Sequence, residues 1–354
     1  MLRKAASLSL LLTAVLACSS SSSSSDGGDT HGTNPVAPPT PDGPTPTPPP
    51  MPSPDGSTWI AIGIDSEDFS SQGFRMGTVD VTVNVAGKQA AHELLDSAAG
   101  PLFPHELKVN APSDALDAEV EVIVVANDTS TPTNSPPLVK RSAKTHFVPK
   151  ANKLLFLYLE VRCNTDQLLG GGGPTGPTCT EPDQTCIGGA CVSDVVTALP
   201  DYTADWRTNP PSNCGSGTPD LVVGAGETAY APLADGDTVD VQEGPQCGHH
   251  VWLALDMKNL SQFGTTTVVT ATQPNGGKTV PVTAFPYAYS VNGATCDLPG
   301  IRFQLDIAGN AIADFLGKPL DITVDATDKA GRKATATRHV VVSSTFTKGP
   351  RPCP

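Results

Sequence analysis

The nine cysteines are the residues of this sequence whose chemistry is most informative. They are Cys18, Cys163, Cys179, Cys186, Cys191, Cys214, Cys247, Cys296 and Cys353. Cys18 directly follows an apolar N-terminal segment, and the other eight are an even number, which predicts four disulfides in an exported chain. The spacing C-x15-C-x6-C-x4-C of the first four lacks the C-x2-C pair with which zinc sites present two thiolates. Disulfides are therefore preferred over a zinc site, although spacing alone does not choose their connectivity.

Two other groups of side chains could bind a metal. His249 and His250 are adjacent, but successive residues of a strand point to opposite faces, so we expect one imidazole beside Trp252 and the other in solvent. The acidic segment 235–243 (DGDTVDVQE) could supply oxygen ligands to Ca²⁺, although it lacks the spacing of an EF-hand loop. It ends the region 166–243, where twelve acids face the single base Arg207. We predict no metal site, and any calcium effect should fall within 166–243.

Motifs for covalent or hydrolytic chemistry are missing from the mature chain. It contains no G-x-S-x-G, H-E-x-x-H or S-x-x-K, and cysteines held in disulfides are not nucleophiles. We therefore predict no catalytic residue, no cofactor and no enzyme. A secreted hydrolase with two carboxylates and no visible motif is the minor alternative, because a glycosidase needs nothing more.

The composition of the chain excludes nucleic acid as a partner and disfavours sugars. The 354 residues carry 36 acidic and 22 basic side chains, a net charge of −14, which does not suit a nucleic-acid backbone. Aromatic residues make up 5 %, so few rings are available to stack on sugars. We expect Trp206 to plug the space between the cysteine-rich region and the C-terminal domain. After the N-terminus no apolar run is long enough to span a bilayer.

Period-two alternation of apolar residues recurs through two blocks of the chain and predicts strands. Clear examples are residues 59–64 (WIAIGI), 79–85 (VDVTVNV), 119–125 (EVEVIVV) and 153–161 (KLLFLYLEV), and further strands follow between 219 and 345. No helical periodicity separates the strands, which favours β-sandwiches over βαβ units.

The hairpin at 321–342 (DITVDATDKAGRKATATRHVVV) resembles the closing hairpin of bacterial immunoglobulin-like domains. In that family a D-x-x-G turn joins two alternating strands, and Asp328 and Gly331 occupy those places. The fold prediction is all-β, with two immunoglobulin-like β-sandwich domains, a disulfide-rich connector and a disordered Ser/Pro-rich tether. The predicted boundaries are 1–17 for a signal peptide, 18–57 for the tether, 58–163 for domain 1, 164–215 for the connector, 216–345 for domain 2 and 346–354 for a tail.

The N-terminal residues have the pattern of a secretory signal. Arg3 and Lys4 precede the apolar segment 8–17 (LSLLLTAVLA), which is too short for a membrane-spanning helix. Residues 15–18 (VLAC) resemble the lipobox of bacterial lipoproteins, with Val15 where that family usually has Leu. The resemblance implies that Cys18 carries a lipid, and Ser19 after it resembles the outer-membrane sorting class.

The segment after Cys18 is a candidate tether. Residues 19–25 are all serine, and eleven prolines fall between 35 and 54. Polyserine cannot bury a core, and the Pro/Thr stretch favours extended polyproline II, which reaches roughly 60 Å at about 3.1 Å per residue. We therefore expect a stalk that holds the folded part away from a membrane.

Residues 179–192 (CTEPDQTCIGGACV) resemble small cysteine knots that recur in predicted surface lipoproteins of large-genome bacteria. Our predicted pairing there is alternating, Cys163 with Cys186 and Cys179 with Cys191. Cys247 and Cys296 each stand just before a predicted strand, so we predict that they pair with each other. Cys214 would then pair with Cys353, which ties the C-terminal tail to the connector.

The functional prediction is a non-enzymatic lipoprotein of the bacterial outer membrane, displayed at the cell surface for adhesion, envelope structure or partner binding. Its partners would be the membrane, through the lipid on Cys18, and an unknown protein or glycan. The alternative is a carbohydrate- or calcium-dependent surface module.

Overall fold

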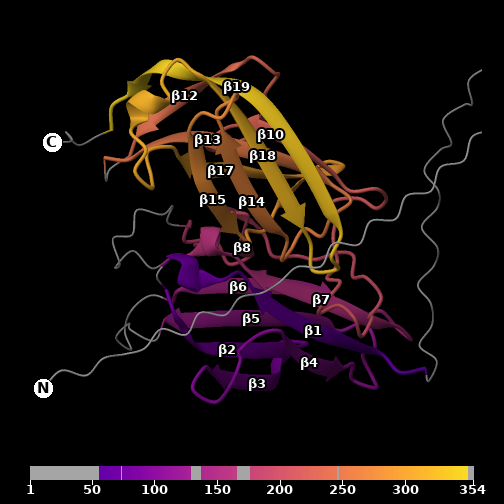
Figure 1. The fold of residues 1–354 in the computed structure, drawn as a ribbon. Helices are drawn as coiled ribbons and strands as arrows, with labels where there is room; N and C mark the ends of the chain where they lie inside the picture. Colours follow the sequence, from indigo (N-terminus) through magenta and orange to yellow (C-terminus); the bar gives the residue numbers. More distant parts are fainter. Residues whose placement is uncertain (1–55, 73, 129–136, 166–175, 245–246, 350–354) are drawn as a thin grey trace, which may run out of the picture. The chain divides into compact units, whose positions relative to one another are not determined.

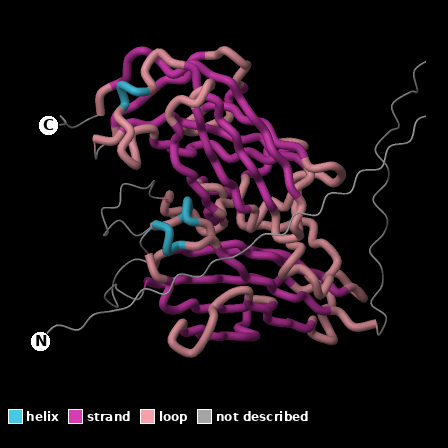
Figure 2. The backbone as a smooth tube through the Cα atoms, in the orientation of Figure 1, coloured by secondary structure: helices cyan, strands magenta, loops and turns pink. Residues whose placement is uncertain are grey.

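Strands and the loops between them make up nearly all of the chain that the computed structural model describes, which is residues 56–72, 74–128, 137–165, 176–244 and 247–349 (Figure 2). The predicted signal peptide and the tether up to residue 55 lie outside these ranges. Within them the helical elements are short 3-10 turns: η1 (Phe69–Gln72), η2 (Val161–Cys163) and η3 (Ile312–Asp314). The predicted all-β fold class is confirmed.

The first seven strands form two sheets around one shared core. They are β1 (Trp59–Ser66), β2 (Met76–Val85), β3 (Lys88–Asp96), β4 (His105–Asn110), β5 (Glu119–Asp128), β6 (Val139–His146) and β7 (Asn152–Leu159). One sheet has the order β4-β1-β7 and the other β3-β2-β5-β6 (Figure 1). In β2 the side chains of Val79, Val81 and Val83 are fully buried and those between them are partly exposed, so the alternation places one face of the strand on the core.

A short hairpin follows this sandwich and corresponds to the predicted connector. It consists of β8 (Gln184–Ile187) and β9 (Ala190–Ser193), in which Cys186 lies opposite Cys191. Two backbone hydrogen bonds attach the segment after it to β6: Lys144 N donates to Asp194 O and Val196 N to Lys144 O, both at 2.8 Å. The connector therefore covers part of an edge strand that would otherwise present unpaired backbone groups.

The remaining strands belong to one continuous sheet with its own core. They are β10 (Asp220–Ala225), β11 (Ala231–Pro232), β12 (Thr238–Glu243), β13 (His249–Lys258), β14 (Thr266–Thr272), β15 (Thr279–Phe285), β16 (Ser290–Asn292), β17 (Thr295–Gln304), β18 (Pro319–Thr327) and β19 (Lys333–Thr347). Their order is β11-β10-β13-β12-β19-β18-β14-β15, with β17 also paired to β13 and β16 to β17. Large side chains such as Phe303, Phe315 and Tyr289 fill the core. An immunoglobulin-like topology stays a prediction, and β19 continues two residues into the predicted tail.

The turn between β18 and β19 has the predicted D-x-x-G form. Gly331 N donates to Asp328 O at 2.9 Å, and Gly331 has a φ of 81°, which favours glycine. The turn begins at Asp328. Its buried carboxylate accepts hydrogen bonds from Arg332 N and Arg332 Nε, both at 2.9 Å, and these bonds stabilise the turn.

Trp206 covers the outer face of the β4-β1-β7 sheet. Its indole is fully buried against Ala61 and Leu154, and its Nε1 donates to Glu106 Oε2 at 2.6 Å. The sequence-based expectation that Trp206 fills the space between the connector and the second domain is wrong, because the nearest apolar surface belongs to the first sandwich. Gly63 permits this packing, since a Cβ there would lie 3.2 Å from three atoms of the indole.

Substituting Gly63 by Ala should therefore destabilise the protein. Ala is normally better than Gly in a strand, but the added methyl would press on an indole that Glu106 holds in place. We expect a loss of about 1 kcal/mol in the free energy of unfolding, measured by urea denaturation. Gly100→Ala is the matched control, because a Cβ at Gly100 meets no atom within 4 Å. Equal stability of the two variants would contradict the assigned packing.

Candidate functional site

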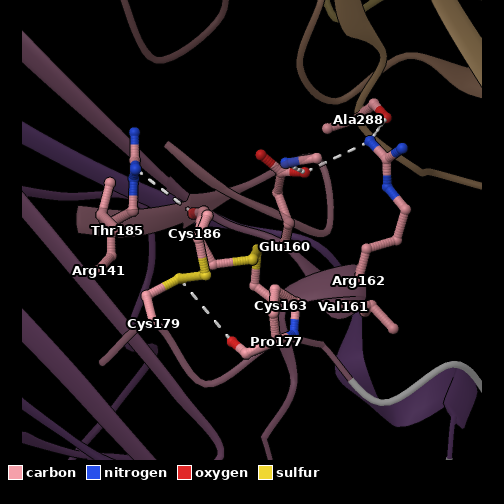
Figure 3. The surroundings of a disulfide bond; sticks show 12 residues. Arg141, Glu160, Val161, Arg162, Cys163, Pro177, Cys179, Thr185, Cys186 and Ala288 are labelled. Carbon is pink, nitrogen blue, oxygen red and sulfur yellow. Dashed lines mark hydrogen bonds and ion pairs between the residues drawn. A yellow bond between two sulfur atoms is a disulfide. The ribbon is translucent and has the colours of Figure 1, made fainter. Parts of the chain in front are cut away.

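One disulfide joins the connector to the end of the first sandwich, and a second closes a loop within the connector (Figure 3). Cys163 bonds to Cys186 with a Cα–Cα distance of 5.7 Å, and Cys179 bonds to Cys191 with 5.5 Å. The predicted alternating pairing is confirmed. Cys163 and Cys186 are also buried members of the sandwich core, so the first disulfide joins the connector hairpin to that core.

The predicted pairing of the C-terminal cysteines is wrong. Cys214 bonds to Cys296, with a Cα–Cα distance of 5.2 Å, and not to Cys353. In the antiparallel pair of β13 and β17, Cys296 lies opposite Met257 near the end of β13, whereas Cys247 precedes the beginning of β13. Cys247 and Cys296 thus lie at opposite ends of the same strand pair. Cys247 is itself disulfide-bonded, and Cys353 lies outside the described residues, as does Cys18.

Cys214 reaches Cys296 because the chain before β10 passes the far end of β13. Asn259 follows β13 and donates its backbone N–H to Cys214 O at 2.6 Å. The disulfide therefore joins the beginning of the second β domain to the end of its central strand, and both sulfur-bearing residues are fully buried.

A cavity of 660 Å³ lies between the connector and the outer side of β5 and β6. Its walls combine apolar groups with charged and hydroxyl side chains, including Ile123, Pro177, Lys140, Ser142 and Asp194. This volume falls in the range of ligand-binding pockets. Its walls also include the carboxylates of Glu121 and Glu181, so the cavity offers apolar contact, hydrogen bonds and charge to a bound molecule.

Buried charged side chains link the connector and the first sandwich to the second β domain. Glu67 Oε2 accepts a hydrogen bond from Val161 N at 2.6 Å, and Glu67 Oε1 accepts one from Ala288 N. Arg162 Nη2 donates to Ala288 O at 2.6 Å (Figure 3). The N–H and C=O groups of one residue in the second domain are therefore held by an acid and a base of the first.

The hairpin is tied into the same cluster through Glu160. Its Oε2 accepts from Gly188 N at 2.8 Å and from Arg162 Nη2 at 3.3 Å. Arg141 Nη1 donates to Cys186 O at 3.3 Å on the other side of the hairpin (Figure 3). Buried charges need such partners, because an unpaired ion in a protein interior costs several kcal/mol.

Burial dominates the electrostatics of this cluster. It raises the pKa of Glu67 to about 7, and the nearby Glu160 carboxylate raises the pKa further, while the hydrogen bonds from Ala288 and Val161 lower it. Burial likewise raises the pKa of Glu160 and lowers that of Arg141 to about 10. The charge of Glu67 therefore changes near neutral pH.

The two adjacent histidines are both buried, which corrects the expectation that one lies in solvent. His250 packs edge-on against Trp252 with ring centroids 4.8 Å apart, as predicted, and burial lowers the pKa of His250 to about 4. His249 Nδ1 lies 2.7 Å from Asp306 Oδ2, and its ring packs against Phe346. The two imidazoles have separate partners and do not converge on one site.

The acidic segment 235–243 uses most of its carboxylates for hydrogen bonds within the fold. Asp235 Oδ1 accepts from His339 N at 3.1 Å, Asp237 Oδ2 from Ala234 N at 2.8 Å, and Glu243 Oε2 from Gly349 N at 3.1 Å. Across the described ranges, no three His, Cys, Asp or Glu side chains are grouped so as to hold a metal ion.

No protein-family model matches this chain, and no curated protein matches it in sequence. A solved structure from a study of how a 1.5-MDa bacterial ice-binding adhesin is retained on the host cell surface is similar, at 10 % identity and a TM-score of 0.19. The match covers 81 % of this chain and 64 % of that chain, so this chain spans less than two thirds of that structure. A TM-score this low carries no argument about function.

Of the helices in the described part of the chain, none has the length and apolar character needed to cross a bilayer.

Replacing both Cys214 and Cys296 by Ala should destabilise the protein more than replacing both Cys179 and Cys191. The first disulfide closes a separation of 82 residues and the second one of 12. Chain-entropy arguments give about 4.5 and about 3 kcal/mol for loops of these sizes, as upper figures. Guanidinium denaturation of the two double variants measures the difference. Equal losses, or a larger loss from the short loop, would contradict this ranking.

The pKa of Glu67 predicts that stability falls as the pH rises. The pKa of the Glu67 carboxyl is near 4.5 in the unfolded chain and about 7 in the folded protein. Between these pH values the carboxyl is protonated only in the folded state. The free energy of unfolding should therefore decrease by about 3 kcal/mol from pH 4.5 to above 7 because of this group. Urea denaturation at pH 5 and pH 8 should show a smaller decrease for Glu67→Gln than for the unchanged protein.

Asp114→Asn is the control for this comparison, because Asp114 is an exposed acid of the same domain. It should leave the difference between pH 5 and pH 8 unchanged. A Glu67→Gln variant with the same pH dependence as the unchanged protein would show that Glu67 does not titrate near neutral pH.

Proposed function

We propose that this chain is a non-enzymatic, lipid-anchored protein of the bacterial outer membrane that displays its β domains for adhesion, envelope structure or partner binding. The observation that carries the proposal is the oxidised state of the cysteines. All seven cysteines in the described ranges, from Cys163 to Cys296, are disulfide-bonded. Disulfides form and persist in exported proteins and are rare in reducing compartments.

The N-terminal sequence supplies the means of anchoring. The signal-like segment 1–17 ends at Cys18, and the Ser/Pro-rich residues 18–57 separate that cysteine from β1. Several acyl chains on one residue anchor a protein firmly, because each buried methylene contributes about 0.8 kcal/mol. A stalk of roughly 60 Å in extended polyproline II would then hold the β domains away from the bilayer.

The folded part has properties that suit display outside the cell. The disulfides and the Glu67–Ala288–Arg162 contacts restrain the parts that have little apolar core of their own, namely the connector and its junctions. The cavity beside the connector is of a size that can bind a short peptide or a sugar unit. Of the alternative, a carbohydrate- or calcium-dependent surface module, this cavity favours the carbohydrate-binding form within the same surface protein.

The anchoring proposal is tested with a Cys18→Ser variant expressed in a Gram-negative host. The unchanged protein should partition into detergent and carry an acylated N-terminus by mass spectrometry, and the variant should move to the aqueous phase. Ser19→Ala, which keeps the cysteine, is the matched control and should stay in the detergent phase. Retention of Cys18→Ser in detergent, or an unacylated Cys18, would overturn the proposal.

The released Cys18→Ser protein also separates the two binding candidates. Specific retention on a glycan array would favour the carbohydrate-binding module. Capture of an envelope protein without glycan binding would favour a protein partner.

A further inference from the structure

A small polar cavity lies on the outer face of the second β domain, where β13 pairs with β17. Its volume is 280 Å³, close to the lower end of ligand-binding pockets, so it suits a small molecule or one unit of a larger one. Phe303 is fully buried in the core, so the alternation along β17 directs its neighbours Arg302 and Gln304 to the outer face. The cavity is lined by these two residues and by His250, Asp306, Gly244, Cys247 and Gly248.

The imidazole in the cavity wall has unused hydrogen-bonding capacity. His250 is only 5 % exposed, and neither nitrogen of its ring has a hydrogen-bond partner among the described residues. A neutral imidazole carries one N–H donor and one acceptor nitrogen, and leaving a buried polar group unpaired is destabilising. A ligand oxygen in the cavity would accept the N–H of this ring.

The guanidinium in the same wall is a positive charge without a partner in the described ranges. Arg302 is exposed and, within those ranges, forms no ion pair with an acid and lies over no aromatic ring. Burial is the largest cause of the low pKa of His250, and Arg302 lowers that pKa further by more than Asp306 raises it. The electrostatic potential at the imidazole is therefore positive, which favours an anion in the cavity.

Asp306 limits the charge that such an anion can carry. Its carboxylate is used within the fold, because Oδ1 accepts from His249 N at 2.8 Å and from Gln304 Nε2 at 3.2 Å, and Oδ2 lies 2.7 Å from His249 Nδ1. It still places one negative charge in the wall, which repels a doubly charged phosphate more than a singly charged carboxylate. A carboxylate also matches the planar fork of Arg302, which can donate two parallel hydrogen bonds to it.

An indole surface lies beside the guanidinium. Trp252 is directly opposite Arg302 in the register of β13 and β17, so both side chains are on the outer face. The indole is partly exposed, and its Nε1 donates to Gln242 Oε1 at 2.9 Å, which fixes its orientation. A ligand held by Arg302 therefore meets an apolar ring surface next to it, which suits the C–H groups of a sugar ring.

We propose that this cavity binds the carboxylate of an acidic sugar unit, a uronate, with Arg302 as the charged donor and the ring of His250 as a second donor. The site shares no residue with the cavity beside the connector. It also does not depend on the lipid anchor, so failure of the anchoring proposal leaves it unaffected.

Titration of the released, ¹⁵N-labelled Cys18→Ser protein with sodium glucuronate at pH 7 tests the proposal by NMR. The chain has three tryptophans, so it gives three indole N–H signals. Trp252 lies beside the cavity, whereas Trp59 and Trp206 pack in the first sandwich and serve as internal references. Only the Trp252 signal, assigned with Trp252→Phe, should shift and saturate. Glucose, which lacks the carboxylate, should leave it unchanged, and inorganic phosphate should shift it only at higher concentration.

Arg302→Gln should weaken glucuronate binding roughly tenfold or more, because it removes a charged hydrogen-bond donor. Unchanged reference signals of Trp59 and Trp206 in this variant show that it is folded. Lys258→Gln is the matched control, because Lys258 is an exposed base at the other end of β13, and it should bind like the unchanged protein. No shift of the Trp252 signal, an equal shift with glucose, tighter binding of phosphate than of glucuronate, or full affinity in Arg302→Gln would each overturn the proposal.

Discussion

The two β domains are joined at the buried carboxylate of Glu67, which accepts hydrogen bonds from both. It is almost completely buried, and its two oxygens accept backbone N–H groups from Val161 at the end of the first sandwich and from Ala288 in the second domain. Arg162 completes the contact by donating to the carbonyl of the same Ala288. A hydrogen bond to a charged group is stronger than one between neutral groups, and removing one partner leaves the other buried without compensation.

The connector shows how a segment with little core is kept in one conformation. Its hairpin of two four-residue strands buries few side chains of its own, and an isolated hairpin is marginal in water. The Cys163–Cys186 disulfide ties it to the sandwich, Cys179–Cys191 ties it to the preceding part of the connector, and backbone hydrogen bonds attach the following segment to the edge of β6. The Glu160 carboxylate then accepts the N–H of Gly188 at the hairpin turn, so the electrostatic cluster and the disulfides restrain the same few residues.

The features that could be predicted from the sequence are those that depend on residues close together in the chain. Alternation in strands such as β2 and β5, the Asp328–Gly331 turn and the nearby cysteine pairs depend on residues close in the chain. The pairing of Cys214 with Cys296 depends on which end of β13 each cysteine approaches, and strand direction and neighbour order are not encoded in a period-two pattern.

The predictions for single side chains were wrong for the same reason, because their contacts are with residues far away in the sequence. Trp206 packs on a sheet whose strands lie more than forty residues earlier, and the buried His249 finds its partner in Asp306, which follows β17. Glu67 and Glu160 had no motif to mark them. Their importance comes from burial and from the proximity of Arg162 and Ala288, which only the folded chain brings together.

Two buried titrating groups act on stability in opposite directions. Glu67, whose pKa is raised to about 7, contributes stability that is complete below about 4.5 and is lost as the pH rises through 7. His250, whose pKa burial lowers to about 4, contributes stability that is complete above about 6.5 and is lost as the pH falls through 4. Between about pH 4.5 and 6.5, Glu67 holds its proton only in the folded state, whereas His250 holds its extra proton only in the unfolded state. Because each involves a single proton, their slopes offset one another over about pH 4.5–6.5. Above pH 6.5, of these two effects only that of Glu67 remains, so the free energy of unfolding falls there without compensation from His250.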